Sequence, residues 1–230
     1  MRPVHPAALA ALLFLLAGAP ITSVARAQSV ESGAVEAGAV EAGTAARLEA
    51  QASQIASDSG AEATERRARM LRRAGQLWLV AGEPRAAIRA QSAALTLAPE
   101  NAGLLIDRSI AHGFAGDHWA ALDDLYHALD LDPGNVEATI FRAATYRALA
   151  SPDLAHDDLD RALALNPDHP DALFERGDLR AALGDRTGAT ADWRRLVEVA
   201  PDSAAASSAR RVMASSGWRA DPEMAEKRGD

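Results

Sequence analysis

The histidines are the residues of this chain best suited to bind a metal ion or to transfer a proton. The five that follow residue 27 are His112, His118, His127, His156 and His169. No two of them are four residues apart, the spacing that places two imidazoles on one helical face. The chain also has no cysteine to supply thiolate ligands. We therefore expect no metal site and no cofactor.

Neighbouring carboxylates are the other candidates for chemistry, because two acids can divide the acid and base roles of a reaction. Asp123 and Asp124 form one such pair, and Asp157 and Asp158 form another. A pair that recurs at the same place in two similar segments indicates a structural motif, since one catalytic site needs it once. No nucleophile motif and no phosphate-binding glycine loop accompany the pairs. We therefore expect no catalytic residue and no enzymatic activity.

The interval between those pairs is the period of the central part of the chain. The phrase Ala-Leu-Asp-Leu-Asp-Pro that ends at Pro133 returns in related form at Pro99, Pro167 and Pro201, every 34 residues. A strict period of this length is typical of stacked units that are each too small to bury their own apolar face. With proline at position 32, the region 61–203 contains the repeats 68–101, 102–135, 136–169 and 170–203.

Each repeat has the pattern of two helices joined by a tight turn. Position 15 is glycine in three repeats and Ala150 in the third, and glycine there can take the left-handed conformation that ends a helix. Small residues recur at positions 8, 20 and 27, where two helices can approach closely, and large residues occupy most of positions 4, 11 and 24. The low aromatic content and the many alanines and leucines also favour helix.

This arrangement of large residues, small residues and proline resembles the tetratricopeptide repeat family over residues 68–203. The resemblance implies an all-α fold, an α-solenoid of four helix-turn-helix repeats. We expect a C-terminal capping helix over 204–218 to cover the last repeat, and a loose tail over 219–230. The resemblance says little about function, because the family is a scaffold used in many processes.

In proteins of this family the first helix of each repeat lines a concave groove through positions 2, 5, 9 and 12. The candidate binding residues implied for this chain are Arg72, Gln76, Ile106, Ile110, Phe114, Ile140, Arg147, Phe174 and Asp178. The middle of this groove is apolar, with arginine towards one end and aspartate at the other. This favours a partner segment with apolar side chains and some charge. The alternative is that Ile106, Ile110, Ile140 and Phe174 cover each other or pack against the leading helix 45–56.

These features indicate a non-catalytic protein–protein interaction scaffold that binds a peptide segment or a partner protein of unknown identity. The alternative is an assembly or chaperone factor that serves several clients. The formal net charge of −8, without an extended cluster of lysine and arginine, argues against nucleic acid as the partner.

Residues 1–27 are typical of a secretory signal peptide. Arg2 precedes an apolar run from Ala7 to Ile21, and small residues stand at the two positions that a signal peptidase recognises. The run of 15 residues is shorter than the ~20 needed to span a bilayer, so we expect no stable membrane insertion after cleavage. Without cysteine there is no lipid attachment. We therefore expect an exported, soluble protein of a bacterial periplasm.

Residues 28–60 are expected to form a flexible tether that contains a short helix over 45–56. Glycine recurs every five residues at Gly33, Gly38 and Gly43, and glycine in a helix interior is destabilising. The segment also has little apolar mass with which to build a core.

An arginine at position 7 and an aspartate at position 23 occur together in the last three repeats, whereas both positions are alanine in the first. Joint loss of the two charges indicates that they form an ion pair between the two helices of a repeat, because a partly buried charge without its partner is costly. The predicted pairs are Arg108 with Asp124, Arg142 with Asp158, and Arg176 with Asp192.

Overall fold

The computed structural model describes residues 27–55, 60–215 and 218, and within these residues all regular secondary structure is helical. The described residues fall into two compact units, 27–150 and 151–218. The expected signal peptide lies outside the described residues except for Ala27, and so does the expected tail 219–230.

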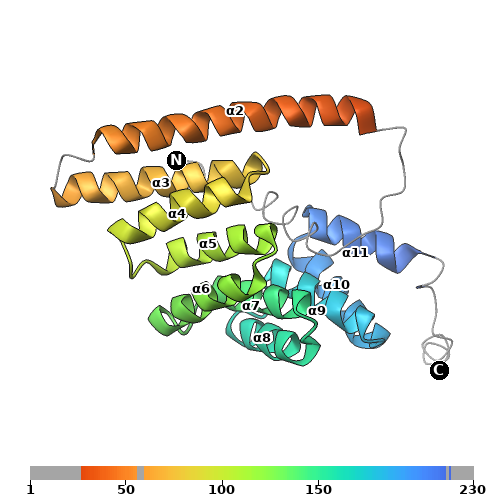
Figure 1. Cartoon of the computed structure of the whole chain (residues 1–230). Helices are drawn as coiled ribbons and strands as arrows, with labels where there is room; N and C mark the ends of the chain where they lie inside the picture. The colour runs from red at the N-terminus through yellow and green to blue at the C-terminus, as the bar shows by residue number, and fades with distance from the viewer. Residues whose placement is uncertain (1–26, 56–59, 216–217, 219–230) are drawn as a thin grey trace, which may run out of the picture. The chain divides into compact units, whose positions relative to one another are not determined.

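The first unit is a succession of helices in which each packs on the next (Figure 1). Its helices are α2 (Ala27–Gln54), α3 (Ala61–Val80), α4 (Pro84–Leu97), α5 (Ala102–Ala115), α6 (His118–Leu131) and α7 (Val136–Ala148). The first helices of successive repeats also touch, α3 with α5 and α5 with α7. This is the stacking that a 34-residue period predicts, because each hairpin buries its apolar face against its neighbours.

The second unit continues the same pattern. It contains α8 (Pro152–Leu165), α9 (Pro170–Ala182), α10 (Arg186–Val199) and α11 (Ala204–Ala214). Helix α11 packs on α10 and α9. Trp218 lies against Trp193 with ring centroids 4.9 Å apart and donates its indole N–H to the Thr190 hydroxyl at 3.1 Å. The end of the chain therefore covers α10 as a capping element.

The residue that ends the first helix of each repeat has the left-handed conformation expected at position 15. The φ angle is 77° in Gly82, 82° in Gly116, 55° in Ala150 and 88° in Gly184. Glycine adopts this conformation without a steric penalty, whereas alanine at the same place costs on the order of 1 kcal/mol. Ala150 therefore adopts the same turn as the three glycines, although alanine does not favour this conformation.

Helix starts at position 34 of the repeats are capped by side chains. Asn101, Asn135 and Ser203 each accept a hydrogen bond from the backbone N–H three residues later. His169 does the same through Nδ1, and burial lowers the pKa of this imidazole, which favours the neutral form that can accept the bond. Asp117, which precedes α6, makes no such bond.

Helix α2 is the main departure from the expected organisation. A single helix of 28 residues spans Ala27–Gln54, where we expected a flexible tether over 28–44 and a short helix over 45–56. The segment is rich in alanine, the residue with the highest helix propensity, which offsets the glycines. Packing on α3 supplies the rest of the stability.

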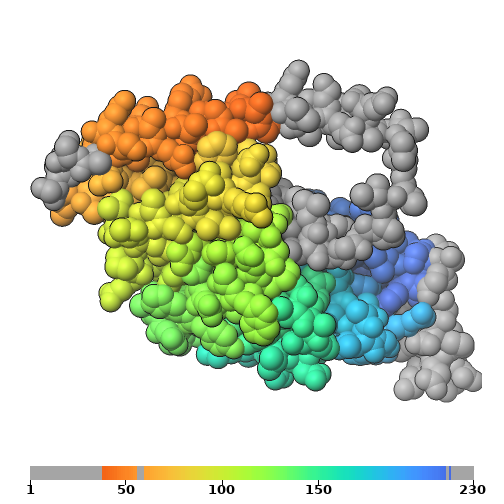
Figure 2. All heavy atoms as spheres, viewed as in Figure 1, coloured from red at the N-terminus to blue at the C-terminus, as the bar shows by residue number. Residues whose placement is uncertain are grey.

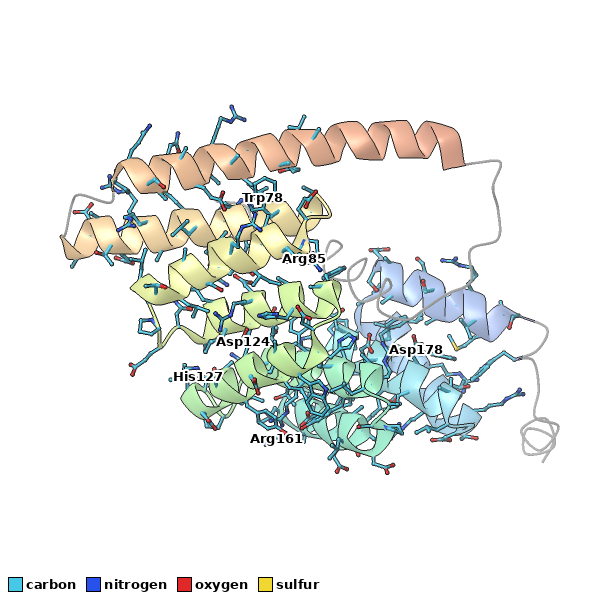
Figure 3. All side chains as sticks on the ribbon, viewed as in Figure 1. Trp78, Arg85, Asp124, His127, Arg161 and Asp178 are labelled. Atoms are coloured by element: carbon cyan, nitrogen blue, oxygen red, sulfur yellow. The ribbon has the colours of Figure 1, made fainter. Side chains whose placement is uncertain are left out.

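The contact between α2 and α3 is apolar with one polar anchor. Ala45 is fully buried in a cluster with Ala74, Leu77 and Ala90, against which Leu48 and Trp78 pack. The Trp78 indole donates a hydrogen bond to the Glu49 carboxylate on α2 at 3.2 Å (Figure 3). Helix α2 therefore covers the outer side of the first repeat, as α11 covers the last helices of the second unit.

We predict that Gly43→Ala stabilises the protein. A Cβ at this position would meet no atom within 4 Å, and alanine in place of glycine inside a helix adds about 1 kcal/mol. Urea unfolding followed by circular dichroism measures the difference. Gly82→Ala is the control and should destabilise the protein, because Gly82 has positive φ. A Gly43→Ala variant of unchanged stability would contradict a folded α2.

Two of the three predicted arginine–aspartate pairs are confirmed within the units. Arg108 donates from Nη2 and Nε to the two carboxylate oxygens of Asp124, at 2.6 and 2.9 Å. Arg176 binds Asp192 in the same two-pronged way, at 2.7 and 3.0 Å. The third pair joins residues of different units and stays a prediction. In the first repeat the alanines at both positions pack together in the cluster with Ala45.

The same arginines also contact the preceding repeat, at its position 25. Arg108 donates to the Ser92 hydroxyl at 3.1 Å, and Arg176 donates to Asp160 at 2.8 Å. The guanidinium of Arg142 lies over the Tyr126 ring, 5.1 Å from its centroid. The arginine at position 7 therefore contacts a different side chain at position 25 of the preceding repeat in each case.

Candidate functional site

A pocket of about 470 Å³ opens in the first unit where α3, the end of α4 and the start of α5 meet. Its walls combine apolar and polar side chains. They are Ala61, Thr64, Glu65, Ala68, Arg69, Arg72, Leu97, Ala98, Asn101 and Leu104.

Arg72 is the group in this pocket best placed to bind a ligand. Its Nε donates to Oδ2 of Asp107 on α5 at 2.5 Å, and Gln76 donates to the same oxygen at 3.3 Å. The side chain of Arg72 remains 42% exposed, whereas that of Asp107 is 14% exposed. No hydrogen bond within the described residues uses Nη1 or Nη2 of Arg72. Its outer edge can therefore present two parallel donors to a carboxylate.

Gly103 and Asp107 hold the guanidinium from two sides. A Cβ on Gly103 would lie 3.2 Å from Nη2 and 3.3 Å from Nη1 of Arg72, so the missing side chain leaves room for the guanidinium. Burial raises the pKa of the Asp107 carboxyl, although the charge and hydrogen bond of Arg72 and the hydrogen bond of Gln76 act in the opposite direction. The arginine is thus fixed by a carboxylate that has little other solvation.

The remaining polar groups of the pocket already have partners. Arg69 donates to Glu65 one turn earlier, and the Thr64 hydroxyl donates to a backbone carbonyl at 3.1 Å. The Asn101 amide oxygen accepts from the backbone N–H of Leu104 at 3.1 Å. The pocket therefore offers one fixed cationic fork beside alanine and leucine side chains, which suits an acidic group flanked by apolar ones.

The expected open apolar lining is not observed at its centre. Ile106 is 4% exposed and Ile140 is 3% exposed, so neither offers surface to a partner in this conformation. Ile106 lies on α5, whose neighbours α3 and α7 touch it on both sides. The alternative of self-packing holds for these two residues.

The other expected groove residues are distributed over three helices. Ile110 and Phe114 on α5 and Arg147 on α7 are half-buried. In the second unit, Phe174 is buried and Asp178 is half-buried on α9. Of the nine expected residues, Arg72 and Gln76 meet at the carboxylate of Asp107.

Asp107, Asn101 and Leu104 were absent from the expected site. Asp107 is at position 6 of its repeat, where the other repeats have Arg73, Phe141 and Glu175. A position with no common residue carries no periodic signal. Asn101 caps α5, but nothing in its spacing in the sequence shows that it borders a pocket.

In residues 27–55, 60–215 and 218, no group of three or more histidine, cysteine, aspartate or glutamate side chains is arranged to hold a metal ion. None of the helices described there combines the length and the apolar character needed to cross a membrane.

No protein-family model matches the sequence. No curated protein matches it either.

Solved structures give a consistent fold. A thermophilic TPR protein of Thermus thermophilus is similar at 20% identity, covering 73% of this chain and 96% of that chain, with a TM-score of 0.58. YrrB, described as a TPR protein with an unusual peptide-binding site, is 19% identical and covers 71% and 90%, with a TM-score of 0.53. A tetratricopeptide repeat protein of Parabacteroides merdae is 25% identical and covers 64% and 58%, with a TM-score of 0.52. The chain therefore has the tetratricopeptide repeat fold, an all-α solenoid.

Proposed function

We propose that the protein is a non-catalytic interaction scaffold of the bacterial periplasm. It binds a segment of a partner protein that carries a carboxylate flanked by apolar side chains. The segment sits in the pocket between α3, α4 and α5, with its carboxylate on the outer edge of Arg72. The signal-like residues 1–27 support export, and the repeat fold supports a binding role.

The geometry of Arg72 carries this proposal. Asp107 fixes the guanidinium through Nε, which reduces the side-chain entropy that a ligand would have to remove. Among the described residues, the two outer nitrogens have no partner, and they border a pocket that also contains Leu97 and Leu104. A hydrogen bond between charged groups in such a place contributes about 1.5–3 kcal/mol.

The test uses a fluorescein-labelled octapeptide of alternating glutamate and leucine, titrated into the full chain and followed by anisotropy. We expect Arg72→Met to weaken binding at least about tenfold, because it removes the charged fork and keeps most of the apolar stem. A peptide with glutamine in place of glutamate should bind the wild-type chain as weakly as the acidic peptide binds the variant.

Arg73→Met is the matched control. Arg73 is the next residue on α3, is exposed and does not line the pocket, yet its loss changes the net charge equally. We expect it to change affinity by less than about twofold, since exposed charges are screened. Equal weakening by both variants, or no binding of the acidic peptide to the wild-type chain, would contradict the proposed site.

A further inference from the structure

Helix α6 exposes large aromatic side chains among acidic ones. Trp119 is 72% exposed and Tyr126 is 47% exposed, and Asp123 and Asp130 are exposed between and beyond them. The spacing of four, three and four residues places these side chains on one helical face. We call these four residues the aromatic–acidic stripe.

The polar groups of Asp123, Asp130 and Trp119 are available to bind a partner. Within the described residues, no hydrogen bond or ion pair involves the carboxylates of Asp123 and Asp130 or the indole N–H of Trp119. Tyr126 differs, because its hydroxyl contacts that of Tyr146 and its ring already carries the guanidinium of Arg142 at 5.1 Å. The Tyr126 ring of the stripe therefore already binds an arginine of its own chain.

Helix α4 carries the complementary surface at the same positions of the preceding repeat. Arg85 and Arg89 are exposed where α6 has Trp119 and Asp123, and the small residues Ala93 and Thr96 follow. Within the described residues, neither arginine contacts a carboxylate; Arg89 donates only to the backbone carbonyl of Arg85, at 3.3 Å. We call Arg85, Arg89, Ala93 and Thr96 the basic stripe.

We propose that a second copy of this chain docks its basic stripe on the aromatic–acidic stripe. With the two helices antiparallel, Arg85 faces Asp130, and Arg89, one turn later, faces Tyr126 and Asp123. The rise of about 1.5 Å per residue makes the spacing of the charges on the two helices compatible with this pairing. The contact joins opposite charges.

The same alignment covers the most exposed aromatic side chain. Trp119 comes to lie over the small residues of the basic stripe, Ala93 and Thr96, where an indole can be buried without displacing a larger group. Aromatic residues in such positions dominate the binding energy of interfaces. Both helices contribute to the face shown in Figure 2, and Figure 3 labels Arg85 on α4 and His127 beside the stripe on α6. A second copy of the chain carries the basic stripe that this contact requires.

The test is sedimentation velocity of the full chain at roughly 50 μM, in 50 mM and 500 mM salt. We expect reversible self-association that weakens at high salt, because the contact is partly ionic. Trp119→Ala should lower the association constant at least about tenfold. Asp123→Arg with Asp130→Arg should be monomeric, and so should Arg85→Glu with Arg89→Glu. An equimolar mixture of these two charge-reversed chains should associate again.

The control places the same charge reversal on another repeat. Asp153→Arg with Asp157→Arg makes the same change of charge on α8, at the positions that Trp119 and Asp123 occupy on α6, and this variant should associate like the wild-type chain. Circular dichroism confirms that each variant is folded, and Trp119→Ala alone decides the matter if a reversed variant unfolds. A wild-type chain that stays monomeric in low salt, a mixture that does not associate, or a control that loses association would overturn the proposal.

Discussion

Arg108→Ala should lower the free energy of unfolding by about 3 kcal/mol, the cost of leaving a buried charge without its partner. The side chain of Asp124 is 6% exposed and that of Arg108 is 26% exposed. The hydrogen bond to Asp124 raises the pKa of the Arg108 guanidinium, because it stabilises the charged form. After the substitution, the Asp124 carboxylate is buried without its partner. Urea unfolding at pH 7 measures the loss.

The double variant Arg108→Ala with Asp124→Ala should lose only about 1 kcal/mol, because no uncompensated charge remains. The first repeat supports this expectation, since its alanines at the two positions, Ala74 and Ala90, are buried together. If the single variant were as stable as the double variant, the ion pair would not explain the joint presence of the two residues.

Gly177→Ala should destabilise the second unit by about 2 kcal/mol in spite of the higher helix propensity of alanine. A Cβ at this position would lie 2.5 Å from Nε1 and 2.6 Å from Cδ1 of Trp193. Trp193 is 1% exposed and its ring packs against Trp218, so it cannot move without displacing the cap. Thermal and urea unfolding should both show the loss.

Adding Trp193→Leu should recover part of the loss caused by Gly177→Ala. The third repeat has alanine and leucine at these two positions, Ala143 and Leu159. The indole N–H of Trp193 has no hydrogen-bond partner among the described residues, so leucine breaks no such bond. Gly43→Ala, where a Cβ meets nothing, is the contrasting glycine substitution. A fully stable Gly177→Ala single variant would contradict the close packing of α9 and α10.

The expected helix pairs, turns and ion pairs were predictable because they recur. The proline and glycine positions, and the exchange of Arg108 and Asp124 for two alanines, can be compared among four repeats. A single irregular residue does not erase such a pattern, and Ala150 accordingly adopts the same turn as the three glycines. Comparison of the four repeats thus predicts the structure of a segment whose own residues do not indicate it.

Features that occur once were not predictable in this way. Helix α2 depends on packing against α3, so its glycine-containing sequence alone indicated a tether. Arg72 was expected to bind a partner, but its anchor Asp107 is 35 residues away and has no counterpart in the other repeats. That anchor binds Nε of Arg72, and Nη1 and Nη2 have no hydrogen-bond partner among the described residues.

The sequence by itself determined an all-α stack of four tetratricopeptide repeats and the residues that join the two helices of a repeat. Only the tertiary structure decided which side chains face solvent. Ile106 and Ile140 occupy positions of a binding groove and yet are buried, whereas Arg72 stays accessible. The physical reason is that helical period fixes the direction of a side chain on its helix, while the distance to the neighbouring helices fixes whether anything covers it.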